Sequence, residues 1–187
     1  MTPAIQELFD MRCHAAADDL MHDGELPFQM IFRSANGELI ACVADMPDAP
    51  EERDLLVAVL RLMAVAHDAD AVCISAEVWI DPDRHDGRRP SESPSRYEAL
   101  KVSVMYRDDA GLSLVQSVRR IIRDAFGKIC ELGASGEPPT AVRCDESMGR
   151  LARILPPHRP SRHERRLAKA AIEMLPRHAG MTSSAGV

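Results

Sequence analysis

The stretch AVCISAEVWI, residues 71–80, decides the fold of this chain. It is short, rich in β-branched side chains and followed by turn-forming residues, which is typical of a β-strand. Because successive strand side chains point to opposite faces, one face would carry the apolar residues Val72, Ile74, Ala76, Val78 and Ile80. The other face would carry a mixed set, Cys73, Ser75, Glu77 and Trp79. The sequence therefore predicts a hydrophobic core on one side of this strand.

A hairpin is predicted earlier in the chain. Residues 27–35 and 38–44 are two short, mainly apolar runs. Asn36-Gly37 lies between them, and this pair favours a type I′ turn, which needs positive φ at both positions. The two runs are therefore expected to pair as antiparallel strands.

Two helices flank the hairpin. Residues 3–22 carry apolar side chains at helical spacing behind an N-cap threonine and a proline. The second helix, residues 48–67, begins at Asp48 and has acidic residues in its first turn, where they suit the helix dipole. Its broad apolar face, which includes Leu55 and Val59, predicts that it packs onto the sheet.

Further strands follow the central one. Residues 98–107 and 112–123 have strand character, and residues 129–132 are a short edge strand. The fold class is thus α+β, an antiparallel sheet of about five strands with helices packed mainly on one face, in the order α-β-β-α-β-β-β(-β)-α-α. This element order resembles that of roadblock and longin modules, and the resemblance implies a dimerising scaffold.

The C-terminal part is interpreted as a separate unit. Residues 1–140 form the sheet domain, and residues 141–187 form a helical extension. A short helix is predicted over residues 145–155. The last helix begins at Ser161, which forms a capping box with Glu164. The final residues, AGMTSSAGV, are expected to fray.

Three segments carry a second resemblance. They are RRPSESPSRYEALKVSV (88–104), RRIIRDAFGKI (119–129) and GRLARILPP (149–157). Together they are similar to a family of uncharacterised bacterial and phage-associated proteins. The resemblance implies a phage or mobile-element context, and it implies no catalytic residues.

The composition is that of an ordinary soluble domain. Of the 187 residues, 45% are hydrophobic and 28% charged, and this length suggests one main domain. The five cysteines form no CxxC pair, which predicts reduced thiols. No leader pattern is visible, and no run approaches the roughly 20 apolar residues of a membrane span, so a cytoplasmic location is expected. Without glycine-rich phosphate loops, HExxH or GxSxG, the sequence predicts no cofactor and favours a non-enzymatic role.

Charge is distributed unevenly along the chain. The net charge is −6, yet residues 147–187 hold eight Lys/Arg and two Asp/Glu, a balance of +6, against −12 for residues 1–146. A basic cluster at helical spacing comprises Arg162, Arg165, Arg166 and Lys169. The acidic body and the lack of interleaved aromatic residues favour contact of this cluster with the protein's own acidic body, with a second copy or with an acidic partner. Nucleic acid is the alternative, because it also requires a clustered basic face.

A polar patch is expected on three neighbouring strands. Glu77, Lys101 and Arg119 are central in these strands, and a suitable register would bring them to one face. They could grip an anionic ligand, or they could form cross-strand ion pairs worth roughly 0.2–1 kcal/mol each. Ion pairing is the favoured interpretation, because perturbed carboxylates in sheets are often only paired.

Acidic and histidine residues gather in the loop after the central strand. Asp81, Asp83 and His85 could supply ligands to a metal ion. Their spacing does not match a calcium-binding loop, and a second group around His67 and Asp68 lies about 30 Å away, at the other end of the strand. The sequence therefore predicts a solvated loop without metal, and without a catalytic serine because no nucleophile motif surrounds its serines.

The function that these patterns favour is a non-enzymatic protein-interaction or scaffold module. It would dimerise or dock a partner through a sheet edge or the C-terminal helix. One alternative is a small ligand- or metal-binding enzyme that uses the polar patch. The other is a phage or mobile-element factor that contacts nucleic acid through the basic C-terminal helix. No membrane partner is expected.

Overall fold

The computed structural model describes residues 1–43, 46–82, 93–134, 139–144, 150–175 and 182–185. The elements in chain order are α1 (Pro3–Asp23), β1 (Gln29–Ser34), β2 (Leu39–Val43), α2 (Pro50–Ala66), β3 (Ala69–Ile80), β4 (Tyr97–Asp108), β5 (Gly111–Arg123), β6 (Ile129–Leu132), β7 (Val142–Arg143), the 3-10 helix η3 (Arg150–Arg153), α3 (Arg162–Glu173) and β8 (Thr182–Ala185). Within these residues, no helix has the length and apolar character needed to cross a membrane.

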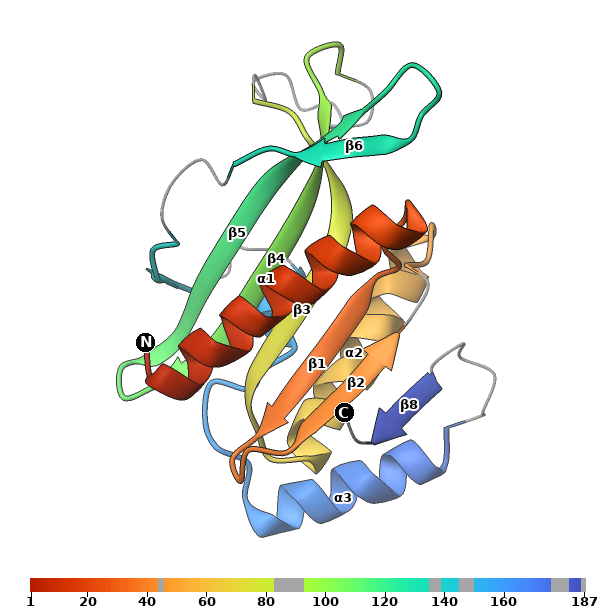
Figure 1. Cartoon of the computed structure of the whole chain (residues 1–187). Helices are drawn as coiled ribbons and strands as arrows, with labels where there is room; N and C mark the ends of the chain where they lie inside the picture. Colours follow the sequence, from red (N-terminus) through yellow and green to blue (C-terminus); the bar gives the residue numbers. More distant parts are fainter. Residues whose placement is uncertain (44–45, 83–92, 135–138, 145–149, 176–181, 186–187) are drawn as a thin grey trace.

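One antiparallel sheet organises the molecule (Figure 1). Its strand order is β6-β5-β4-β3-β1-β2-β8, and β7 pairs with β5. β3 lies in the middle, where Val72 is in register with Phe32 of β1 and with Met105 of β4. The predicted α+β class is confirmed, and the sheet is larger than expected because β7 and β8 extend it.

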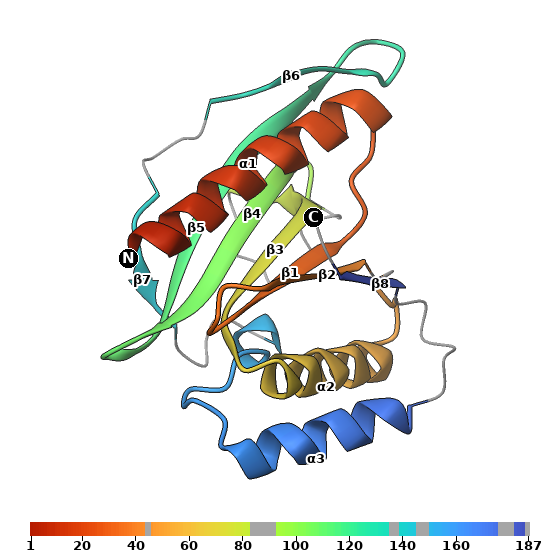
Figure 2. The same cartoon turned by 60° about the horizontal axis from the view of Figure 1, so that its bottom comes forward.

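Helices cover both faces of the sheet: α2 and α3 lie on one side, while α1 covers the other (Figure 2). α1 covers one face, and its Leu8 and Phe9 share a core cluster with Cys73 of β3. α2 covers the opposite face, and its Leu60 belongs to a second cluster with Val72. α3 lies outside α2 on that same side (Figure 2).

The apolar character of the second buried face is apparent only when neighbouring strands are compared. Cys73 is in register with Val104, and Val104 with Val115. All three are buried on the α1 side. On β3 alone, Cys73 and Ser75 give this face a mixed character. When the neighbouring residues of β4 and β5 are included, the face is apolar, and it needs a helix to cover it.

The β1–β2 hairpin forms as predicted, with a different turn. Gly37 N–H donates to Ser34 O at 2.9 Å, and Ser34 N–H donates to Glu38 O at 2.9 Å. Gly37 has φ of 88°, and Asn36 is not in the positive-φ region. The chain therefore uses a type I turn followed by a left-handed glycine, not the type I′ turn that the Asn-Gly pair predicted.

α2 begins later than predicted and buries a narrower face. Ala49 is its N-cap, not Asp48, and no side chain caps it. Val59 is buried as expected, but Leu55 is 64% exposed. Leu55 therefore does not belong to the face that α2 presents to the sheet.

The C-terminal part is less helical than predicted. Part of the predicted helix over residues 145–155 lies outside the described residues, and residues 150–153 form the 3-10 helix η3. The expected fraying of the end is wrong for residues 182–185, because β8 pairs with β2 and continues the sheet.

Two substitutions of one type test the orientation of α2. Leu60 is 1% exposed, so Leu60→Ala should lower the free energy of unfolding by about 2–5 kcal/mol because it leaves a cavity in the core. Leu55→Ala, on the same helix, should change it by less than about 0.5 kcal/mol. Urea unfolding followed by circular dichroism measures both values. Equal losses would show that α2 faces the sheet differently.

Candidate functional site

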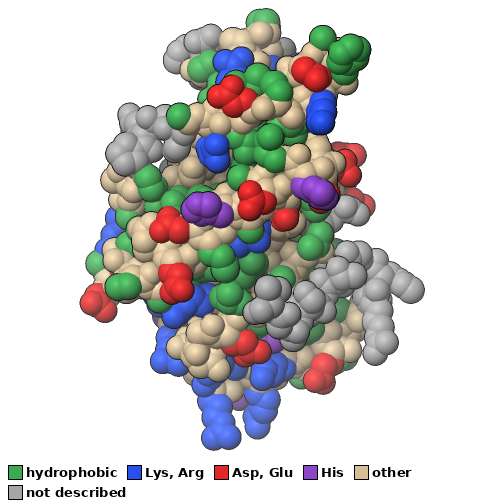
Figure 3. All heavy atoms as spheres, in the orientation of Figure 1, with side chains coloured by type: hydrophobic (Ala, Val, Ile, Leu, Met, Phe, Trp, Pro, Cys, Tyr) green, Lys and Arg blue, Asp and Glu red, His purple; other side chains and the backbone are tan. Residues whose placement is uncertain are grey.

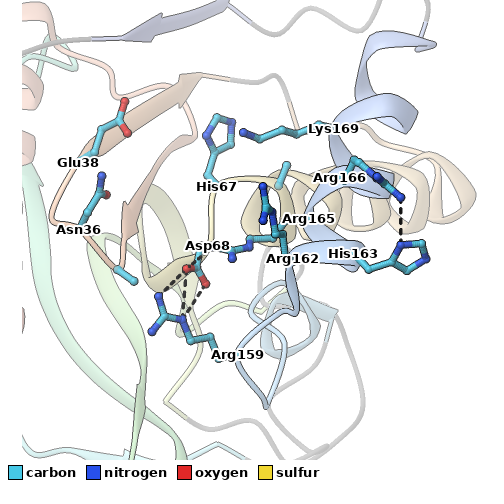
Figure 4. A pocket seen from close by; sticks show the side chains of 12 residues that line it. Asn36, Glu38, His67, Asp68, Arg159, Arg162, His163, Arg165, Arg166 and Lys169 are labelled. Carbon is cyan, nitrogen blue, oxygen red and sulfur yellow. Dashed lines mark hydrogen bonds and ion pairs between the residues drawn. The ribbon is translucent and has the colours of Figure 1, made fainter.

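A hollow of about 1070 Å³ lies between α3, the end of α2 and the β1–β2 turn (Figure 4). The chain segment that leads into α3, together with α3 itself, lines it with Arg159, Arg162, His163, Arg165, Arg166 and Lys169. The β1–β2 turn and the end of α2 supply Asn36, Glu38, His67 and Asp68. We call this set the basic hollow. Figure 3 shows Lys and Arg side chains gathered at this end of the molecule.

A capping box positions the basic side of α3. Glu164 N–H donates to Ser161 Oγ at 3.2 Å, and Ser161 N–H donates to Glu164 Oε2 at 2.7 Å. The hydrogen bonds with Ser161 also lower the pKa of Glu164. Since the helix starts at Arg162, residues three and four positions further on lie on the same side. Ala168 is the buried contact of α3 with the body.

Asp68 holds the elements of the basic hollow together. Its carboxylate, 11% exposed, accepts hydrogen bonds from Arg159 Nη2 and from Arg165 Nη1, each at 2.7 Å. Its backbone carbonyl accepts from Ala35 N–H of the β1–β2 turn at 3.0 Å. The hydrogen bond from Arg159 is the largest influence on the carboxyl group, and it lowers the pKa of Asp68 despite burial. One residue thus joins the end of α2, the hairpin and α3.

Three cations of the basic hollow have no carboxylate partner among the residues that the structure describes: Arg162, Arg166 and Lys169. Among the described residues, the one hydrogen bond of these three side chains joins Arg166 Nη2 and His163 Nδ1, at 3.5 Å. Burial, and then the charge of Lys169, lowers the pKa of His67, which favours the neutral imidazole. Positive charge therefore exceeds negative charge in the basic hollow, and the site suits an anion.

The four residues predicted as a partner-binding cluster, Arg162, Arg165, Arg166 and Lys169, all line the basic hollow. Arg165 is already engaged by Asp68, so three of the four are available. Sequence reasoning missed the role of Asp68, which lies 91 residues before Arg159. No spacing rule could indicate this pair, because only the tertiary fold brings the two residues together.

The predicted polar patch is divided between the two faces of the sheet. Leu100 is in register with both Glu77 and Arg119, so these two share the α1 face. Lys101 is in register with Ala76 and points to the other face. Arg119 donates to two backbone carbonyl groups at the end of β6, at 2.9 and 3.1 Å, and not to Glu77.

The cation that contacts Glu77 is Arg123. Arg123 Nη2 lies 3.2 Å from Glu77 Oε2, and its Nε lies 2.6 Å from Glu98 Oε2. Leu26 N–H donates to the other oxygen of Glu77 at 2.6 Å. Both oxygens of Glu77 are therefore satisfied, and the contacts tie β5 to β3, β4 and the segment before β1.

The metal candidates do not assemble in the described part of the chain. Asp81 accepts a hydrogen bond from Ser95 Oγ at 3.0 Å. Asp83 and His85 lie outside the described residues. Across the described ranges, no group of three or more His, Cys, Asp or Glu side chains could hold a metal ion.

Comparisons with known proteins identify no relative. No protein-family model, no curated protein and no solved structure matches the chain.

Asp68→Asn tests whether the charge of the Asp68 carboxylate stabilises the contacts that form the basic hollow. A carboxyl group whose pKa is lower in the folded state adds stability above its ordinary pKa of 3.8 and loses it as the pH falls through the folded value. We expect Asp68→Asn to be less stable than the wild type at pH 7, and the difference to shrink below about pH 4. Urea midpoints between pH 7 and pH 3 measure the effect.

Asp18→Asn is the matched control, because Asp18 is exposed on α1. Its urea midpoint should follow that of the wild type throughout the pH range. A penalty for Asp68→Asn that does not change with pH would contradict an electrostatic role for Asp68.

Proposed function

We propose that the chain is a non-enzymatic interaction module whose basic hollow docks an acidic segment of a partner protein. The observation that supports this most is the set of three cations without a carboxylate among the described residues: Arg162, Arg166 and Lys169. Asp68 holds the helix that carries them in place. The backbone that carries these cations is thus fixed while their charges are not neutralised, which lowers the ordering cost of binding an anion.

Exposed apolar side chains on α3 favour a protein partner over a small anion. Leu167 is 55% exposed and Met174, at the C-cap, is 85% exposed. They lie at the side of the helix next to the basic residues and outside the lining of the basic hollow, so a partner that extends beyond the hollow can bury them. Protein interfaces commonly combine such apolar contacts with a charged rim.

The charge of the remaining chain disfavours nucleic acid. Residues 1–146 carry a balance of −12, and acidic side chains are exposed along α1 (Figure 3). The net negative charge of this part of the chain repels an extended polyanion more strongly than a short acidic segment that contacts only the basic hollow. Nucleic-acid binding is therefore the competing outcome of the binding experiment.

Fluorescence anisotropy with a labelled peptide of alternating Glu and Leu residues tests the proposal. We expect binding at low salt that weakens strongly near about 0.5 M salt, because exposed charges are screened. Arg162→Gln/Arg166→Gln should weaken binding by about fivefold, since each exposed ion pair contributes roughly 0.2–1 kcal/mol.

Arg120→Gln/Lys128→Gln is the control, because it removes the same charge from exposed positions outside the basic hollow. This variant should bind the peptide as the wild type does. Equal weakening by the two double variants would show that only the bulk charge matters. Tighter binding of a labelled DNA duplex than of the peptide would replace the proposal with nucleic-acid binding.

Self-association, the other part of the sequence-based hypothesis, stays a prediction. The exposed acidic residues of α1 are complementary in charge to the basic hollow of a second copy. A dimer would have twice the 20.6 kDa mass of the chain. Light scattering at high micromolar concentration and low salt measures this mass, and a monomer there would contradict dimerisation.

A further inference from the structure

A second cavity, of about 470 Å³, lies on the α2 side of the sheet, away from the basic hollow. Its floor is formed by residues of β3 and β4, among them Ile74, Ala76, Val78, Lys101, Ser103 and Met105. The segments before β1 and after β2 and β7 supply its walls, including Phe28, Met46 and Cys144. We call it the apolar cavity. Its size is that of a typical small-molecule site.

One cation, Lys101, lines the apolar cavity. Lys101 is half-buried, and it forms no hydrogen bond or ion pair with any residue that the structure describes. Burial lowers its pKa, and no neighbouring carboxylate opposes this effect. Glu77 is the acidic residue of the lining, but Arg123 and the backbone of Leu26 already engage its two oxygens.

An ammonium group in an apolar wall is costly unless something compensates its charge. Lysines on such surfaces usually extend the ammonium group into water. Lys101 lines the apolar cavity together with Ser103, which lies on the same face two residues further along β4 and whose hydroxyl group has no hydrogen-bond partner in the described part of the chain. A cation and a hydroxyl donor at one apolar wall can both donate to a carboxylate.

The geometry points to a binding site for a small amphipathic carboxylate in the apolar cavity. The hydrocarbon chain of the ligand lies over Ile74, Val78 and Met105, and its carboxylate accepts hydrogen bonds from Lys101 and Ser103. The site is independent of the basic hollow, because the two share no lining residue. It adds a ligand to the interaction module instead of replacing its proposed role.

Isothermal calorimetry with octanoate and 1-octanol tests this inference, because the two probes share a chain length and differ in charge. Octanoate should bind about tenfold more tightly than 1-octanol, the difference expected for one charge-assisted hydrogen bond. Lys101→Met should abolish this difference and still bind 1-octanol. The affinity of the wild type for octanoate should also fall as the pH rises, and at a lower pH than the ordinary lysine value of 10.5, because burial lowers the pKa of Lys101.

Two variants serve as controls. Lys128→Met removes an exposed lysine of the β5–β6 turn and should leave octanoate binding unchanged. Arg162→Gln/Arg166→Gln should also retain it, which separates this site from the basic hollow. Lys101→Met should unfold at the same urea concentration as the wild type or a higher one, since it removes a poorly solvated cation. Equal affinities of the wild type for the two probes, a preference for octanoate that persists in Lys101→Met, or no binding of either probe would overturn the inference.

Discussion

Burial of β3 on both faces is the constraint from which the rest of the architecture follows. Cys73 and Ser75 face α1, while Val72 and Ile74 belong to the α2 side. A strand buried on both faces needs a cover on each, so the chain places one helix before the hairpin and another directly before β3. The tight connection from α2 into β3 then sets the position of Asp68, whose φ of 51° accommodates the sharp change of direction.

Local structure, such as turns and helix caps, could be predicted from the sequence wherever residues adjacent in the chain determine it. The hairpin at Asn36-Gly37 and the capping box of Ser161 and Glu164 are both present. The turn type differed, because Gly37 alone takes the left-handed conformation. The coverage of both sheet faces could not be predicted from β3 alone, since the apolar character of the second face is supplied by Val104 and Val115 on neighbouring strands.

The two sites could likewise be predicted only where residues close in sequence determine them. Helical spacing was enough to group Arg162, Arg165, Arg166 and Lys169, because one helix carries all four. In a sheet, the strand register decides to which face a side chain points. Lys101 is opposite Ala76 and not Glu77, and this difference of one position places Lys101 on the face opposite to that of Glu77. The three charged residues therefore do not form one patch: Glu77 is satisfied on one face, and Lys101 lies on the other face without a partner among the described residues.

The contact between Asp68 and Arg159 spans 91 residues, and this separation has a consequence for biosynthesis. Chains emerge from the ribosome starting at the N-terminus, and segments pack as they become available. A nascent chain that ends before Arg159 contains β1 to β7 but only one wall of the basic hollow, the wall formed by the β1–β2 turn and the end of α2. The docking proposed for the basic hollow therefore requires that the chain has been synthesised beyond Arg159 and through α3.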